Sequence, residues 1–185
     1  NFSSTSTDNQ TLTGTSDNDT LVGAAGSDTF NGGAGNDTLV GHAGDDTFNV
    51  TSKSGAYTDT IDGGAGTDTL TISYASISDF TSISYDGGYV TGGNWTLVDS
   101  LGGTLEFANI ELISFDGVTY EIIYSSNNGD VRGDIHNASG RIGGAFYSAS
   151  GNKVVLFDNG GVTNLTLTRL TSYSGSSGDN TTVTG

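Results

Sequence analysis

The chain has 185 residues, of which 33% are hydrophobic and 30 are glycine, and its formal net charge is −16 at pH 7. This low apolar content predicts a thin hydrophobic core for a chain of this length. Interactions other than apolar burial must therefore stabilise part of the fold. The charge argues against nucleic acid and anionic membranes as partners, because few cationic side chains are available to neutralise phosphate: Lys53, Arg132, Arg141, Lys153 and Arg169.

The chain has no cysteine, which excludes disulfides, thiol chemistry and zinc sites built on thiolates. No apolar run is long enough to cross a bilayer, so we expect no membrane insertion. There is also no basic leader followed by an apolar stretch. The absence of an initiating methionine predicts a monomeric fragment of a longer chain.

Aspartate recurs at a fixed interval in the first part of the chain, and a large apolar residue follows two positions after each aspartate. The clearest nine-residue unit runs from Gly32 to Val40. A further copy fits at Ser54 to Asp62 after a four-residue insertion, Val50 to Lys53, and a degenerate copy at Thr5 to Thr13 has Gln10 in the aspartate place. Short repeats of this kind predict stacked coils. The aspartates are Asp19, Asp28, Asp37, Asp46, Asp59 and Asp68, and the apolar residues are Leu21, Phe30, Leu39, Phe48, Ile61 and Leu70.

Each unit is expected to form a tight turn followed by a very short strand. Glycines at the first, second and fourth places permit positive φ in the turn. The sixth-place aspartate then lies at the turn and the eighth-place residue points inward, since side chains alternate along a strand. The glycines of these turns are Gly14, Gly23, Gly26, Gly32, Gly35, Gly41, Gly44, Gly63 and Gly66.

Two units make one full coil, so the aspartates of alternate units share an edge. The insertion preserves this arrangement, which predicts Asp19, Asp37 and Asp59 on one edge and Asp28, Asp46 and Asp68 on the other. Stacked carboxylates repel one another unless a cation lies between them. Ligation by oxygen alone favours Ca²⁺ over Mg²⁺ or zinc. Pairing neighbours on each edge predicts about four ions: Asp19 with Asp37, Asp37 with Asp59, Asp28 with Asp46, and Asp46 with Asp68.

These units resemble the hemolysin-type calcium-binding nonapeptide repeat of RTX proteins, with the pattern Gly-Gly-x-Gly-x-Asp-x-apolar-x. The resemblance covers Gly14 to Ile72. It departs from the pattern at Asp17 and Tyr57 in the fourth place and at His42 in the second. The resemblance implies a parallel β-roll in the C-terminal region of a large bacterial protein that is exported through a type I channel and folds outside the cell.

Downstream of the repeats, residues 68 to 124 alternate apolar and polar side chains between glycine pairs, which predicts β-hairpins. The segment Phe107 to Tyr120 is similar to the strand pair that follows such rolls, and we expect it to cap the open end. Ser125 to Asp130 predicts a turn-rich break. Further strands are predicted at Arg141 to Tyr147, Lys153 to Phe157 and Val162 to Leu170, before a linker-like tail, Ser174 to Asp179.

The predicted fold class is therefore all-β, with an N-terminal parallel β-roll and antiparallel, β-sandwich-like strands capping it. The predicted domains are the roll at residues 1–72, the capping section at 73–124, and further strands and the tail at 125–185.

The remaining motifs have ordinary structural explanations. Arg132-Gly133-Asp134 arises easily in a chain rich in glycine and aspartate, and His42 and His136 form no zinc-protease motif. Asp116 with Glu111 or Glu121 is formally a glycosidase pair, but nothing fixes the separation of these carboxyl groups. The candidates for an aromatic ligand platform, which core packing explains as well, are Tyr85, Tyr89, Trp95, Tyr147 and Tyr173.

The sequence thus predicts a noncatalytic, calcium-dependent structural module of a secreted bacterial adhesin at the cell surface, with calcium as its partner. Two alternatives remain open. One is the noncatalytic C-terminal module of a secreted lipase, protease or polysaccharide-modifying enzyme. The other is a calcium-dependent module in which residues 125–185 bind a cell-surface glycan or a peptide.

Overall fold

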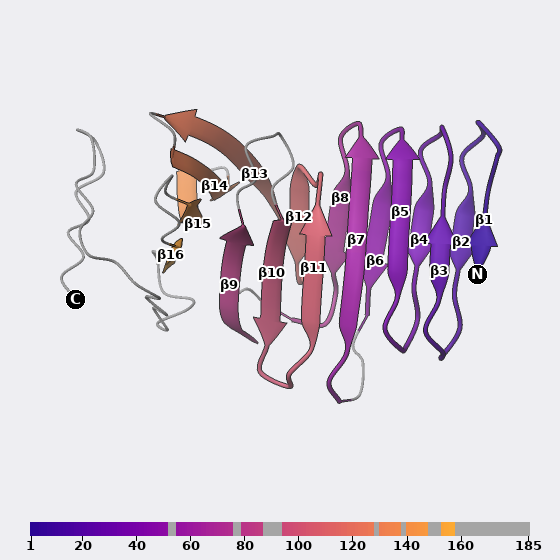
Figure 1. Ribbon diagram of the computed structural model, residues 1–185, viewed down its shortest axis with the longest axis horizontal. Coiled ribbons are helices and arrows are strands. Elements are labelled where there is room, and N and C mark those ends of the chain that lie inside the picture. Colours follow the sequence, from indigo (N-terminus) through magenta and orange to yellow (C-terminus); the bar gives the residue numbers. More distant parts are fainter. Residues whose placement is uncertain are drawn as a thin grey trace.

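The computed structural model describes residues 1–51, 55–75, 79–86, 94–127, 130–137, 140–147 and 153–157. These residues form two β-sheets that run along the length of the molecule, with the N-terminal strands at one end (Figure 1). The strands of the seven-stranded sheet are, in spatial order, β1 (Phe2–Ser3), β3 (Thr20–Val22), β5 (Thr38–Ala43), β7 (Thr58–Ala65), β11 (Thr104–Ala108), β10 (Asn94–Asp99) and β9 (Phe80–Asp86). Those of the nine-stranded sheet are β16 (Lys153–Phe157), β15 (Gly140–Tyr147), β14 (Asp130–Asn137), β13 (Val118–Asn127), β12 (Leu112–Phe115), β8 (Thr69–Ile72), β6 (Thr47–Val50), β4 (Thr29–Asn31) and β2 (Thr11–Thr13).

The repeats wind between the two sheets, so that odd-numbered strands join one sheet and even-numbered strands the other. Within the repeats, β1 to β8, neighbouring strands of each sheet are parallel, with Leu21 opposite Leu39 and Phe30 opposite Phe48. Partners are therefore two nine-residue units apart, which confirms the predicted β-roll with two units per coil.

The core of the roll consists of the eighth-place residues. The strands are short, and a β-branched threonine precedes the buried residue in each, as in Thr29 before Phe30. All six predicted inward residues are at most 1% exposed, as the alternation predicts. Phe30 and Phe48 stack with ring centroids 4.7 Å apart, which makes the wall of β4 and β6 the aromatic side of the roll.

The insertion falls in the sequence between Phe48 of β6 and Ile61 of β7 and does not disturb the winding. Val50, its first residue, extends β6 and is buried. Across the insertion Leu39 still lies opposite Ile61, and Phe48 opposite Leu70. The insertion therefore lengthens one turn and keeps every later strand in its predicted sheet.

A final coil closes the roll. β11 pairs parallel with β7 and β12 pairs parallel with β8, so the segment Phe107 to Tyr120 caps the open end as predicted. The sequence predicts antiparallel hairpins throughout residues 68 to 124, yet β11 and β12 continue the parallel ladder. Antiparallel pairing is found for β9 with β10, β10 with β11, and β12 with β13.

Strands β9 to β12, which we call the cap, continue the core of the roll with aromatic side chains. Trp95 is fully buried and stacks on Phe107 with ring centroids 6.2 Å apart, and Phe80 meets Phe115 edge to face at 5.4 Å. Trp95 is therefore part of the core and cannot serve in an exposed ligand platform. The side chains of Tyr85, Tyr89, Tyr147 and Tyr173 lie outside the described residues.

The nine-stranded sheet continues through antiparallel strands β13 to β16. β13 runs through Ser125 to Asn127, so the predicted break at Ser125 to Asp130 narrows to the β13–β14 connection. β15 and β16 match the predicted strands, whereas Val162 to Leu170 and the tail lie outside the described residues. No helix in the described part of the chain has the length and apolar character that a membrane span requires.

Candidate metal centre

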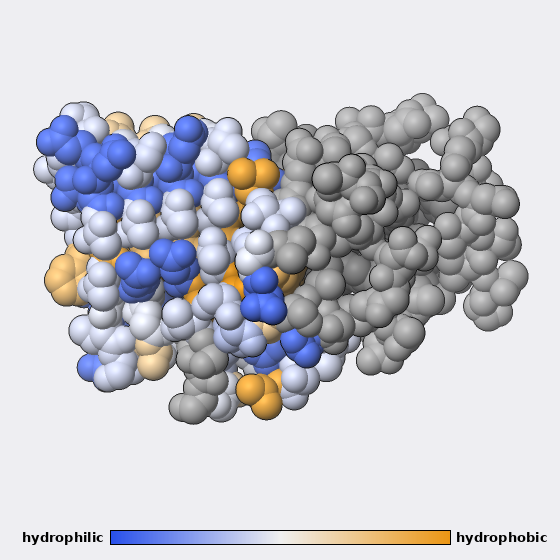
Figure 2. All heavy atoms as spheres, turned by 180° about the vertical axis from the view of Figure 1, so that it is seen from behind, coloured by the Kyte–Doolittle hydropathy of each residue, from blue (hydrophilic) through white to orange (hydrophobic). Residues whose placement is uncertain are grey.

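The sixth-place aspartates lie in the turns that connect the two sheets, on two separate edges of the roll. We call these the Asp28 edge, with Asp28, Asp46 and Asp68, and the Asp19 edge, with Asp19, Asp37 and Asp59. All six side chains are exposed by 9% or less. Figure 2 shows hydrophilic residues gathered along the upper edge of the roll. The six aspartate side chains themselves have almost no contact with water.

The aspartates of each edge form a ladder of hydrogen bonds. The amide of Asp19 donates to Oδ1 of Asp37 at 3.0 Å, and the amide of Asp37 donates to Oδ1 of Asp59 at 2.9 Å. On the other edge the amides of Asp28 and Asp46 donate to Oδ1 of the next aspartate at 2.7 and 2.8 Å. The four predicted pairs are therefore all neighbours in the structure, across the insertion as well.

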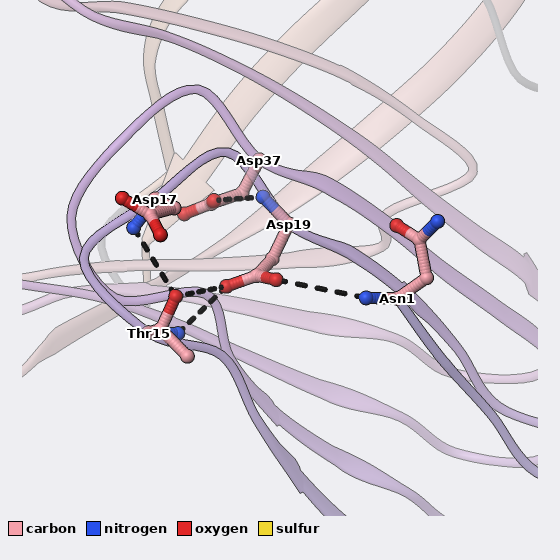
Figure 3. A network of polar contacts seen from close by, with 5 residues as sticks. All are labelled: Asn1, Thr15, Asp17, Asp19 and Asp37. Carbon is pink, nitrogen blue, oxygen red and sulfur yellow. Dashed lines mark hydrogen bonds and ion pairs between the residues drawn. The ribbon is translucent and has the colours of Figure 1, made fainter.

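Asp19 has protein donors for its other oxygen too (Figure 3). Its Oδ2 accepts hydrogen bonds from the amide and the hydroxyl of Thr15, at 2.7 and 2.9 Å. Its Oδ1 lies 3.8 Å from the α-amino group of Asn1. The two Thr15 hydrogen bonds stabilise the charged form and lower the pKa of Asp19 below its ordinary value, so this carboxylate is stable without a cation.

Asp46 and Asp68 differ from Asp19. Their Oδ2 atoms are buried and have no hydrogen-bond partner. Burial raises the pKa of Asp46 above its usual value and that of Asp68 to about 6, and neighbouring carboxylates add to both shifts. A buried carboxylate oxygen without a donor is costly. The Asp28 edge therefore carries negative charge that the protein itself does not compensate.

Main-chain carbonyl oxygens lie beside these carboxylates because the first-place residue is glycine. A β-carbon on Gly41 would collide with Oδ2 of Asp46 and with the carbonyl oxygen of Gly63. Gly23 has the same relation to Asp28 and Gly41, and Gly14 to Asp19 and Gly32. The prediction of positive φ is wrong for the first place, where the requirement is close approach. Left-handed φ occurs at other places, as at Gly33, Gly35, Gly44, Gly64 and Gly66, and at His42 in a second place.

The fifth-place residues form a second ladder of hydrogen bonds, which the sequence alone did not predict. The amide of Ser27 donates to Oδ1 of Asn9 at 3.0 Å, and the amide of Asn36 donates to Oδ1 of Asn18 at 2.9 Å. Asp45 accepts from Thr67 in the same way at 2.8 Å. The signal was present, since the fifth place holds small polar side chains with an acceptor oxygen: Asn9, Asn18, Ser27, Asn36 and Asp45.

The donor set of both edges consists of oxygen. No three His, Asp or Glu side chains converge anywhere in the described residues, so a metal in these turns would need main-chain oxygens beside the carboxylates. His42 is exposed and therefore does not join the buried set. Carboxylate and carbonyl oxygens together suit Ca²⁺, which accepts many oxygen ligands in flexible geometry.

The remaining acidic candidates are separated. Glu111 lies before β12, where its Oε2 accepts the amide of Asp68 at 2.8 Å. Asp116 lies in the turn after the same strand, at its opposite end. The glycosidase pairing of these two residues therefore has no geometric support. Arg132, Gly133 and Asp134 lie within β14, which is paired on both sides.

Comparison with known proteins identifies the repeats. A protein-family model described as the RTX calcium-binding nonapeptide repeat matches residues 6–49 and 53–71. No curated protein sequence matches the chain. The crystal structure of the extracellular lipase LipA from Serratia marcescens is similar with 18% sequence identity and a TM-score of 0.38. That alignment covers 83% of this chain, which spans only 18% of the length of the lipase. Residues 6–49 and 53–71 are therefore RTX calcium-binding nonapeptide repeats, and the strands in them form a parallel β-roll.

Proposed function

We propose that this chain is a noncatalytic structural module of a secreted bacterial protein, and that calcium binding drives its folding. The observation that carries the proposal is the pair of buried, unpartnered Oδ2 atoms of Asp46 and Asp68. Without a cation these charges oppose folding. With a divalent cation beside them, the same charges favour it.

About four ions are expected in the roll, one between each pair of neighbouring aspartates on an edge. The ligands are the carboxylates of Asp19, Asp28, Asp37, Asp46, Asp59 and Asp68 with carbonyl oxygens of the turns. The turns belong to the glycines of the repeats: Gly14, Gly23, Gly26, Gly32, Gly35, Gly41, Gly44, Gly63 and Gly66. The turns of Asp46 and Asp68 should bind first, because their Oδ2 atoms have no donor, whereas Oδ2 of Asp19 accepts from Thr15 and Oδ2 of Asp28 accepts the amide of Ala24.

The magnitude is sufficient for a folding switch. A site whose ligand is present at ten times its dissociation constant stabilises the folded state by about 1.4 kcal/mol. Four independent sites would contribute about 6 kcal/mol, which is comparable to the whole stability of a small domain. Extracellular calcium modules bind in the range of roughly 0.1 to 1 mM. The chain would thus stay unfolded in a low-calcium cytoplasm, pass through a type I export channel, and fold outside.

For the parent protein we favour a surface adhesin, because this part of the chain is long, acidic and built around calcium turns. The alternative, the noncatalytic end of a secreted enzyme, has equal need of a calcium-folded module. The sequence beyond these residues separates the two: an adhesin would have long tandem domains and an enzyme a catalytic domain.

Far-ultraviolet circular dichroism during a calcium titration tests the proposal. We expect the β signal to appear with calcium and not with the same concentration of magnesium, which loses its water reluctantly. A chelated chain with its full β signal and a thermal midpoint that calcium does not move would contradict the proposal.

A further inference from the structure

The turn that closes the last coil differs from those of the repeats. Between Asp62 of β7 and Thr69 of β8 the chain runs through six residues, Gly63 to Asp68, the first three of which belong to β7. Between β11 and β12 only three residues, Asn109 to Glu111, make the same connection. Ala108 lies opposite Asp62 and Leu112 opposite Thr69, so the three-residue turn lies directly over the last glycine turn.

Glu111 makes the contacts that a sixth-place aspartate makes in the repeats. Its Oε2 accepts the amide of Asp68 at 2.8 Å, just as Oδ1 of Asp68 accepts the amide of Asp46 at 2.8 Å. The amide of Leu112 donates to the carbonyl of Asp68 at 2.9 Å, and the amide of Thr69 donates to that of Asp46 at 2.8 Å. The additional methylene of glutamate allows the carboxylate to reach this position from a shorter turn. Glu111 therefore extends the Asp28 edge by one carboxylate, beyond the last repeat.

Asn109 provides the carbonyl that a first-place glycine provides elsewhere. A β-carbon on Gly63 would collide with the carbonyl oxygen of Asn109 and would lie 2.7 Å from Oδ2 of Asp68. This is the arrangement of Gly41 with Gly63 and Asp46 one coil earlier. Asn109 has φ 53°, a left-handed conformation that asparagine tolerates better than most residues. The side-chain nitrogen Nδ2 of Asn109 donates a hydrogen bond to Oδ1 of Asp62 at 2.8 Å, and this bond holds the turn in place.

An independent observation shows that this position lacks a partner. Oδ2 of Asp68 is buried, has no hydrogen-bond donor, and borders the same space as the Asn109 carbonyl. Asp68 itself is fully buried, so bulk solvent does not reach this oxygen.

We propose that Asp68, Glu111 and the main-chain carbonyl of Asn109 form a fifth calcium site between the last repeat and the cap. The inference rests on the proposed calcium-driven folding and adds to it a ligand from outside the nonapeptide repeats. Its consequence is that calcium joins the roll to β11 and β12, and the cap becomes part of the calcium switch.

The other edge shows the contrast. On the Asp19 edge the residue of the cap opposite Asp59 is Leu105, which offers no carboxylate. That edge ends instead in a carboxylate with protein donors: the hydroxyls of Tyr57 and Tyr74 bond to each other, that of Tyr74 donates to Oδ2 of Asp99 at 3.1 Å, and the amides of Leu101 and Gly103 donate to its Oδ1 at 2.8 Å. The fifth site therefore belongs to the Asp28 edge alone within the described residues.

The test compares the variants Glu111→Gln and Glu106→Gln with the parent chain. Glutamine at 111 can still accept the Asp68 amide, so the turn retains its hydrogen bond while the charge is lost. Glu106 is exposed in the adjacent strand β11 and provides a control for the loss of one charge. Bound calcium is counted by equilibrium dialysis, and hydrogen exchange of residues 104–115 is followed with calcium and with chelator.

We expect E111Q to bind one ion fewer per chain and to lose calcium-dependent protection of residues 104–115, while E106Q matches the parent. An unchanged ion count and unchanged protection in E111Q would overturn the fifth site and leave the proposed function intact. A parent chain that binds no calcium would overturn the proposed function itself. If E111Q fails to fold in calcium, E111D takes its place: the shorter side chain keeps the charge but does not reach the position, so E111D should also bind one ion fewer, and a full ion count in E111D would refute the assignment.

Discussion

The amide of Asp28 donates a 2.7 Å hydrogen bond to Oδ1 of Asp46, eighteen residues later in the chain and one coil away. One carboxylate oxygen thus holds the neighbouring coil in place, while the other points into its own turn beside a first-place glycine. This division explains why the same aspartates serve both the fold and the ion. At Asp46 and Asp68, Oδ1 accepts the amide of the neighbouring coil, and the buried Oδ2, which has no donor, is the oxygen offered to the cation.

The substitution Asp46→Asn should have opposite effects with and without calcium. In chelator it removes a buried, unpartnered charge and should stabilise the fold by about 1 to 3 kcal/mol. In saturating calcium it removes a ligand and should destabilise the fold by a similar amount. The β signal in circular dichroism measures the effect in chelator, and urea unfolding measures it in calcium. Asp45→Asn is the matched control, because Asp45 is exposed and asparagine can still accept the Thr67 amide. A change of the same sign in both buffers would contradict the assignment of Asp46.

Acid should partly replace calcium. Burial first, and then the charges of Asp46 and Glu111, raise the pKa of Asp68 to about 6 from an ordinary 3.8. The folded state therefore binds a proton more tightly than the unfolded chain does. Asp68 contributes this stability fully below about pH 4 and loses it as the pH rises through 6. In chelator we expect a larger β signal in circular dichroism at pH 5 than at pH 7, and Asp68→Asn should reduce the difference. Equal signals at the two pH values in the parent chain would contradict the prediction.

The variant Gly41→Ala should impair calcium binding on the Asp28 edge. Its β-carbon would overlap Oδ2 of Asp46 and the carbonyl oxygen of Gly63, so the backbone must move away. Overpacking of this kind costs about 1 to 3 kcal/mol. The calcium concentration at the midpoint of the circular-dichroism titration should rise. Gly117→Asn is a suitable comparison, because Gly117 has no neighbour within 4 Å and asparagine tolerates its φ of 79°. An equal shift in both variants would argue against a specific role for Gly41.

The aromatic stack should contribute a large part of the stability of the roll. Phe48→Ala removes a fully buried ring that stacks on Phe30, and should destabilise the calcium-loaded protein by about 3 to 5 kcal/mol. Phe2→Ala, at a residue that is 50% exposed, should change the stability by less than about 0.5 kcal/mol. Thermal unfolding in calcium compares the two. Similar losses would mean that the stack contributes no more than a surface side chain.

The roll could be predicted from the sequence because its contacts repeat at a short, fixed interval. Once Asp37 is assigned to a turn and Leu39 to a strand, every other unit follows, including the copy after the insertion. The edge of each aspartate follows from counting units alone. The exposure of Leu39 and the pairing of Asp37 with Asp59 both agree with that count.

The capping turn could not be predicted in this way. Glu111 occupies its position because β11 and β12 pair with β7 and β8, which lie more than forty residues earlier in the chain. No local pattern gives that register, and a lone glutamate before a strand looks like an ordinary surface residue. Asn109 gave no signal either, since its contribution is a main-chain oxygen.

The aromatic side of the roll, on β4 and β6, helps the chain to pair its repeats in the correct register during folding. The glycine turns are nearly interchangeable, so a coil displaced by one nonapeptide would still find glycines and aspartates where it needs them. Such a slip would move Phe30 and Phe48 from the wall of β4 and β6 to the opposite wall, where Leu21, Leu39 and Ile61 lie. The volumes of the core side chains therefore fix which repeat enters which sheet, a choice that the glycines and aspartates leave open. A winding shifted by one repeat is disfavoured because its aromatic side chains would lie on the wrong side of the core.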